Sequence, residues 1–258
     1  MNKTWRQIIK SILFLAGAFT FAFLLAEAVH ETGHYLTHRW YGNDSIRVHL
    51  DPFGGSRMID DRYLPETGMI ITSAAGPLFS LVLSIGSFLI LLKIRKPALL
   101  PLLIWGPTAM IQEGVNLSLG LFSRNSDAQW IVQSGLPAFL ILMIGIALLI
   151  AGLIGIALLL PLAGIDSKSP FGCTLLIILA GMCSLLIIRL AGTLFTSPDT
   201  LIENLIPLGF SGILALVVTT LQRTITRHQT THYLGWNLVV SNFALGAGMF
   251  LCQIFLFN

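Results

Sequence analysis

Long apolar stretches alternate with short polar segments along the whole chain. A membrane-crossing helix needs about 20 predominantly apolar residues. By this measure there are seven candidate stretches, at residues 8–38, 68–92, 98–122, 137–162, 171–195, 205–221 and 234–257. The sixth is short and is interrupted by Gly209 and Gly212. The pattern therefore predicts an all-α polytopic membrane protein with six or seven transmembrane helices.

The segment after the first apolar stretch has a different period. From Ile46 to Asp51, apolar and polar residues alternate, which is typical of a β-strand. Pro52–Gly55 then supplies turn residues, and Ser56 to Ile59 can return as a second strand. We expect a small β-hairpin here. It is either an ordinary surface ribbon or an exposed strand edge that holds an extended peptide by main-chain hydrogen bonds.

Composition agrees with a membrane protein and excludes other classes. The 258 residues are 55% hydrophobic and 10% charged, which is too apolar for a soluble domain of this length. A formal net charge of +3 without a long basic run does not fit a nucleic-acid-binding protein. The three cysteines all lie in apolar stretches and are interpreted as packing residues. The lipid bilayer is thus the expected environment, and the sequence indicates no oligomeric state.

The first apolar stretch ends in His30-Glu31-Thr32-Gly33-His34, a sequence of the form HExxH. Residues four apart leave the same face of a helix, so the imidazoles of His30 and His34 can take two corners of a zinc tetrahedron. The carboxylate of Glu31 lies beside them, where it can accept a proton from water activated by the metal. Ionisable residues inside a membrane helix are costly unless they have a function. We interpret the motif as a site for one catalytic zinc ion.

A catalytic zinc ion takes three protein ligands and a water molecule, so a third ligand is required. Five side chains are candidates: Glu27, His38, His49, Glu113 and Asp127. Glu27 and His38 share the helix of the histidine pair, whose backbone hinders closure of a tripod, and His49 belongs to the predicted strand. Glu113 lies deeper in its span than the motif does. Asp127 follows a span parallel to the first and returns at the level of the motif, so it is the predicted third ligand.

These features and their order resemble the site-2 protease family of intramembrane zinc metalloproteases. They are the HExxH motif, the strand-like segment with Gly54-Gly55, the sequence Ala74-Ala75-Gly76-Pro77 in the second span, and an aspartate after a span that bears an asparagine. The resemblance covers about the first half of the chain. Ser80 and Ala128 stand where the family has asparagine and glycine.

The resemblance implies a function and assigns roles. His30 and His34 would bind Zn²⁺, Glu31 would be the catalytic acid and base, and Asp127 would be the third ligand. Asn116 matches the family's asparagine upstream of that aspartate and would support the ligands. The expected activity is hydrolysis of peptide bonds within or next to transmembrane segments of membrane protein substrates. The alternative is a proteolytically inactive scaffold or metal-handling protein that retains the zinc site.

The same features suggest a division of the chain and an orientation. Residues 1–134 would form the metalloprotease core, and residues 135–258 would add transmembrane helices of unassigned role. Basic residues precede the first span, join the second to the third, and join the sixth to the seventh, which predicts a cytoplasmic N-terminus and an outward-facing site. The resemblance implies a site nearer the cytosol. In either orientation we expect a multi-pass protein of a bacterial cytoplasmic membrane.

Overall fold

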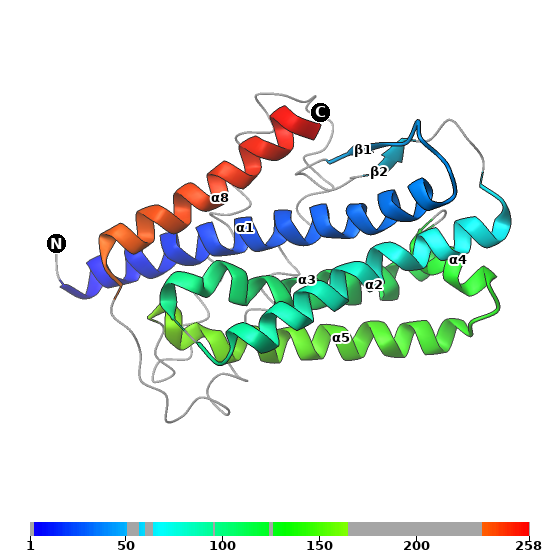
Figure 1. Ribbon diagram of the computed structural model, residues 1–258. Coiled ribbons are helices and arrows are strands. Elements are labelled where there is room, and N and C mark those ends of the chain that lie inside the picture. Colours follow the sequence, from blue (N-terminus) through cyan, green and yellow to red (C-terminus); the bar gives the residue numbers. More distant parts are fainter. Residues whose placement is uncertain are drawn as a thin grey trace.

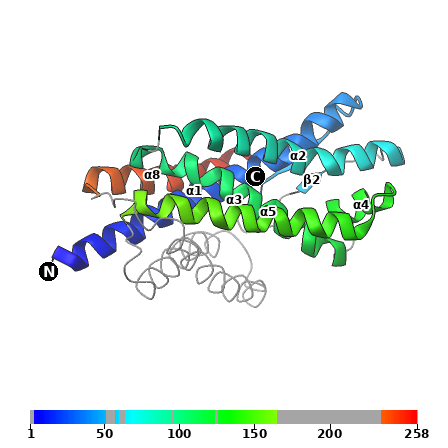
Figure 2. The same ribbon diagram turned by 90° about the horizontal axis from the view of Figure 1, so that it is seen from below.

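The computed structural model describes residues 3–50, 57–59, 64–94, 96–123, 126–164 and 234–257. Within these residues the chain forms a bundle of α-helices with a small hairpin at one end (Figure 1). Seen from below, the long helices run lengthwise along a common direction, and α4 lies at the end away from the N-terminus (Figure 2). The predicted spans at residues 171–195 and 205–221 lie outside the described residues.

Helix α1 (Lys3–Trp40) is the longest element and carries the HExxH motif in its last third. Its 38 residues correspond to roughly 57 Å, nearly twice the hydrocarbon thickness of a bilayer. The helix ends where Gly42 adopts a positive φ of 75°, a conformation that favours glycine after a helix C-terminus. The amide of Asn43 donates to the carbonyl oxygen of His38, so the turn closes back on the helix.

The predicted hairpin is confirmed. Strand β1 (Arg47–His49) pairs antiparallel with β2 (Arg57–Ile59), and Val48 lies opposite Met58. Both strands contact α1. Ile46 and Leu50, which flank β1, are almost fully buried, and they anchor the ribbon to the bundle.

Two further helices of this part of the chain pack along the body of α1. Helix α2 (Glu66–Leu91) runs back from the hairpin end, and α3 (Leu100–Leu119) returns after a 3₁₀ turn over Pro97–Leu99. Helix α3 contacts α1, α2 and α5 (Ala138–Leu159), so it is the central helix of the described bundle. Its central position explains why most of its side chains are buried.

The remaining elements complete the two sides of the bundle. A 3₁₀ turn (Gly120–Phe122) follows α3 and leads to the short helix α4 (Asp127–Gln133). Helix α5 ends in a 3₁₀ turn over Leu160–Ala163, and α8 (Trp236–Phe257) packs along the first half of α1.

The described part of the chain contains fewer membrane-length apolar helices than the spans predicted from the sequence. Among the described residues, three helices are long and apolar enough to cross a membrane, at Arg6–Trp40, Glu66–Leu91 and Ala138–Ala163. The predicted spans at residues 98–122 and 234–257 are helical as α3 and α8 but are not among these three. Polar residues lower the hydropathy of α3, and they include the buried Glu113.

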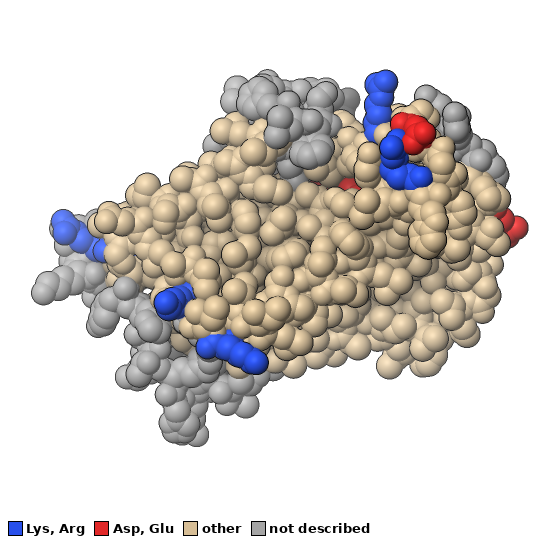
Figure 3. Space-filling view, in the orientation of Figure 1, with Lys and Arg blue, Asp and Glu red and all other residues tan. Residues whose placement is uncertain are grey.

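Charge is distributed unequally over the two ends of the bundle. In Figure 3 the end near the N-terminus shows only Lys and Arg, whereas the opposite end shows both signs and the middle is almost uncharged. The exposed charged residues include Arg6 near the start of α1, Lys93 and Lys96 between α2 and α3, Arg39 and Asp44 around the C-terminal end of α1, Arg47 on β1 and Glu66 at the start of α2. An uncharged middle between charged ends is the pattern expected of a membrane-embedded bundle.

Candidate metal centre

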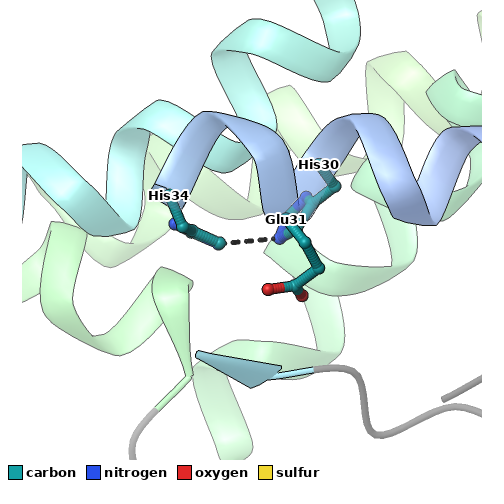
Figure 4. Close-up of side chains that lie close together, drawn as sticks. All are labelled: His30, Glu31 and His34. Carbon is teal, nitrogen blue, oxygen red and sulfur yellow. Dashed lines mark hydrogen bonds between the residues drawn. The ribbon is translucent and has the colours of Figure 1, made fainter. Parts of the chain in front are cut away.

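Helix α1 presents His30, Glu31 and His34 to the same side, toward the hairpin and the interior (Figure 4). All three are buried, with exposed fractions of 6%, 6% and 8%. The Nε2 atoms of the two histidines are 3.0 Å apart. Each side chain offers one donor atom, and the three donor atoms lie within 4.8 Å of one another.

The other nitrogen of each imidazole is held by a different helix. The Nδ1 atom of His34 lies 2.7 Å from the main-chain carbonyl oxygen of Thr72 on α2. A carbonyl only accepts hydrogen bonds, so this Nδ1 carries the proton and Nε2 keeps its lone pair. The Nδ1 atom of His30 lies 2.8 Å from Oε1 of Glu113 on α3. A carboxylate also accepts, so the Nε2 atom of His30 likewise keeps its lone pair.

Asp127 reaches the same point from the first turn of α4. Its Oδ2 atom lies 3.2 Å from Nε2 of His30 and 3.4 Å from Nε2 of His34. The hydroxyl oxygen of Ser126 accepts a hydrogen bond from the amide of Gln129 and caps α4. This cap makes Asp127 the first residue of the helix. Burial raises the pKa of the Asp127 carboxyl, but the two neighbouring imidazoles lower that pKa by a larger amount, so the group is ionised.

Three electron-pair donors therefore converge on one point. The distances between His30 Nε2, His34 Nε2 and Asp127 Oδ2 are 3.0, 3.2 and 3.4 Å. Three corners of a tetrahedron around zinc, with bonds of about 2.0–2.2 Å, would be roughly 3.3–3.6 Å apart. Lone pairs this close repel unless a proton or a cation lies between them. The donor set, its spacing and its burial fit a divalent metal ion held by three protein ligands.

Two glycines allow α1 and α2 to approach closely at the site. A Cβ atom on Gly33, inside the motif, would lie 2.5 Å from the carbonyl oxygen of Ala75. A Cβ atom on Gly76 would overlap the imidazole of His34. The Ala74-Ala75-Gly76-Pro77 sequence thus provides the surface on which the second histidine packs, consistent with the use of small residues between membrane helices.

The other predicted site residues take different places. Glu27 and His38 are buried on α1, and His49 is half-buried on β1. Asn116, which the resemblance places in support of the ligands, is exposed on α3. Glu113, one turn earlier on that helix, contacts His30 instead.

Sequence reasoning considered Glu113 as a ligand and missed its contact with His30. The sequence does place the carboxylate of Glu113 inside an apolar span, but it does not show which side chain that carboxylate contacts. The carbonyl of Thr72 could not have been found from the sequence either, because every residue has one.

Comparison with protein-family models, with curated proteins and with solved structures finds no match in any of the three. The likeness to site-2 proteases therefore rests on the motifs of this chain alone.

Proposed function

We propose that this protein is an intramembrane zinc metalloprotease that hydrolyses peptide bonds within or next to transmembrane segments of membrane proteins. The observation that carries the proposal is the convergence of His30 Nε2, His34 Nε2 and Asp127 Oδ2 within 3.4 Å of one another, with Glu31 beside them. Such a group inside an apolar bundle is costly to maintain without a function.

The residues divide the chemistry between them. His30, His34 and Asp127 would hold the zinc ion, which when bound supplies a Lewis acid for the substrate carbonyl and lowers the pKa of water. Glu31 accepts the proton of the attacking water and then passes it to the leaving amine. The Oε2 atom of Glu31 is buried and makes no hydrogen bond within the described part of the chain, so it is available for this transfer.

The hairpin provides a place for the substrate. A helical substrate must unwind locally before hydrolysis, since the hydrogen bonds of a helix occupy its backbone amides. A two-stranded sheet keeps one unpaired edge on each strand, and such an edge can bind an extended peptide through main-chain hydrogen bonds. Both strands contact α1, and a strand lies directly beneath Glu31 in Figure 4. The proposal assigns the hairpin this role.

The test is the isosteric substitution Glu31→Gln. The purified variant should bind zinc as the wild type does, but cleavage should fall about 10²- to 10⁴-fold because an amide cannot accept the proton. Co-expression with a panel of tagged single-span membrane proteins, followed by detection of shortened fragments, measures cleavage. Glu66→Gln, the same change at an exposed position, is the matched control.

Two outcomes would count against the proposal. Equal cleavage by Glu31→Gln and wild type would exclude Glu31 as the base. Stoichiometric zinc without cleavage of any panel member would favour the metal-handling alternative. A strong chelator should also abolish cleavage, and added zinc should restore it.

A further inference from the structure

The two histidines of the metal centre are held in chemically different ways. His34 donates from Nδ1 to a neutral main-chain carbonyl, that of Thr72. His30 donates from Nδ1 to a carboxylate, that of Glu113, at 2.8 Å. Glu113 comes from a separate helix, α3, and its exposed fraction is 0%. Only His30 therefore has a carboxylate as its hydrogen-bond partner. Helix packing alone does not explain this difference, because any pair of polar groups could tie α3 to α1.

We propose that Glu113 is a positioning residue that acts on the metal through His30. Its carboxylate fixes the ring orientation and tautomer of His30 and makes Nε2 a stronger electron-pair donor. The inference rests on the proposed metal site. It predicts that Glu113 sets metal affinity without touching the metal.

The charges of the site support this role. Asp127 and Glu113 together contribute two negative charges, one on each side of His30. The second oxygen of Glu113, Oε2, is buried and makes no hydrogen bond within the described residues. A buried carboxylate is costly unless a positive charge compensates it. Glu31 is a third carboxylate at the site, so a divalent cation next to Nε2 compensates more of this negative charge than a monovalent ion would.

The competing explanation is that Glu113 only ties α3 to α1. In that case its replacement would destabilise the fold, and any effect on metal binding would not depend on His30. The two explanations differ in what happens when His30 is absent, because a residue that acts through His30 loses its effect together with that side chain.

The experiment compares zinc dissociation constants in detergent, measured by competition with a chromophoric chelator. The proteins are wild type, Glu113→Gln, His30→Ala and the double variant. Glu113→Gln should bind zinc about 10- to 100-fold more weakly than wild type, the range typical of partners that orient metal ligands. In the His30→Ala background, the same substitution should change the dissociation constant less than twofold.

Controls distinguish the proposed role of Glu113 from a general effect of removing a negative charge and from a loss of folding. Glu66→Gln removes an exposed carboxylate at the same end of the bundle and should leave zinc affinity unchanged. The melting temperature of each metal-free variant reports folding. Visible spectra of the cobalt-substituted proteins should show the same coordination number but a shifted band in Glu113→Gln.

Each result decides the inference. Unchanged zinc affinity in Glu113→Gln, or an equal loss with and without His30, would overturn it. These measurements need no substrate, so they are independent of proteolysis. A protein that shows the expected cycle but cleaves nothing would refute the proposed function and leave the role of Glu113 intact.

Discussion

Both halves of α1 contribute buried residues to the bundle, but they hold different kinds of side chain. The first half packs against α8, and Gly17 lies against the backbone of Asn242 and Phe243 there. The second half packs against α2, α3 and the hairpin, and it places five ionisable residues at 6–8% exposure: Glu27, His30, Glu31, His34 and His38.

The two halves show that burial alone does not identify a functional surface. Glycine contacts occur in both: Gly17 approaches the backbone of Asn242, and Gly33 approaches the backbone of Ala75. In the first half, the contact gives helix packing and no more. In the second, it brings acceptors from other helices within reach of two imidazoles. Substitutions in the first half should therefore change the stability of the bundle, and substitutions in the second half should change metal binding.

The largest expected effect is loss of the third donor. Asp127→Ala should weaken zinc binding by more than about 100-fold, since even partners outside the metal shell contribute 10- to 100-fold. Zinc content after dialysis and competition with a chelator measure the loss. Asp44→Ala is the matched control because Asp44 lies at the same end and pairs only with the exposed Arg39 among described residues. Normal zinc affinity in Asp127→Ala would remove Asp127 from the ligand set.

The next effect comes from the surface behind His34. Gly76→Ala should displace that imidazole, because the added Cβ would overlap it. A displacement of about 1 Å can cost roughly 100-fold in activity. We expect cleavage and zinc affinity to fall together while the helical content stays at the wild-type level. Wild-type zinc affinity in this variant would show that the ring has another position that still binds.

The corresponding change in the first half should affect stability alone. Gly17→Ala places a Cβ 2.7 Å from the carbonyl oxygen of Asn242. Overpacking of this kind costs about 1–3 kcal/mol. A lower melting temperature of Gly17→Ala with unchanged zinc affinity, measured under the same conditions as for Gly76→Ala, would confirm the difference between the halves. A drop in zinc affinity would mean that the two halves are coupled through α1.

The smallest effect is expected from single cysteine substitutions, which report the side of the membrane that each end of the bundle faces. Thr67 lies at the start of α2, and Ala98 lies in the turn between α2 and α3; both positions are exposed. A cysteine is placed at one or the other in a background in which the three native cysteines are replaced by serine. The positive-inside bias predicts labelling of Thr67→Cys by a membrane-impermeant thiol reagent in intact cells. Ala98→Cys should react only after the membrane is opened. The reverse pattern would put the metal site on the cytoplasmic side and contradict the orientation predicted from charge.

The sequence predicted the elements better than it predicted their relations. Apolar stretches located α1, α2, α3, α5 and α8, and the period-2 segment located the hairpin. These signals are local, because a helix or strand shows its period within its own residues. The HExxH spacing likewise determined that His30 and His34 leave one face of α1 and that Glu31 stands beside them.

Only the tertiary structure decided what surrounds that face. It brought Oδ2 of Asp127 within 3.4 Å of both ring nitrogens, placed Glu113 behind His30, and left Asn116 exposed. These relations join residues more than 80 positions apart on separate helices. The rotation of each helix about its own axis decides these contacts. Successive residues of a helix are about 100° apart around that axis, so residues close in sequence face different partners. The sequence by itself therefore determined which residues can bind a metal. The packing of α3 against α1, and of α4 against α2 and α3, decided which of them meet.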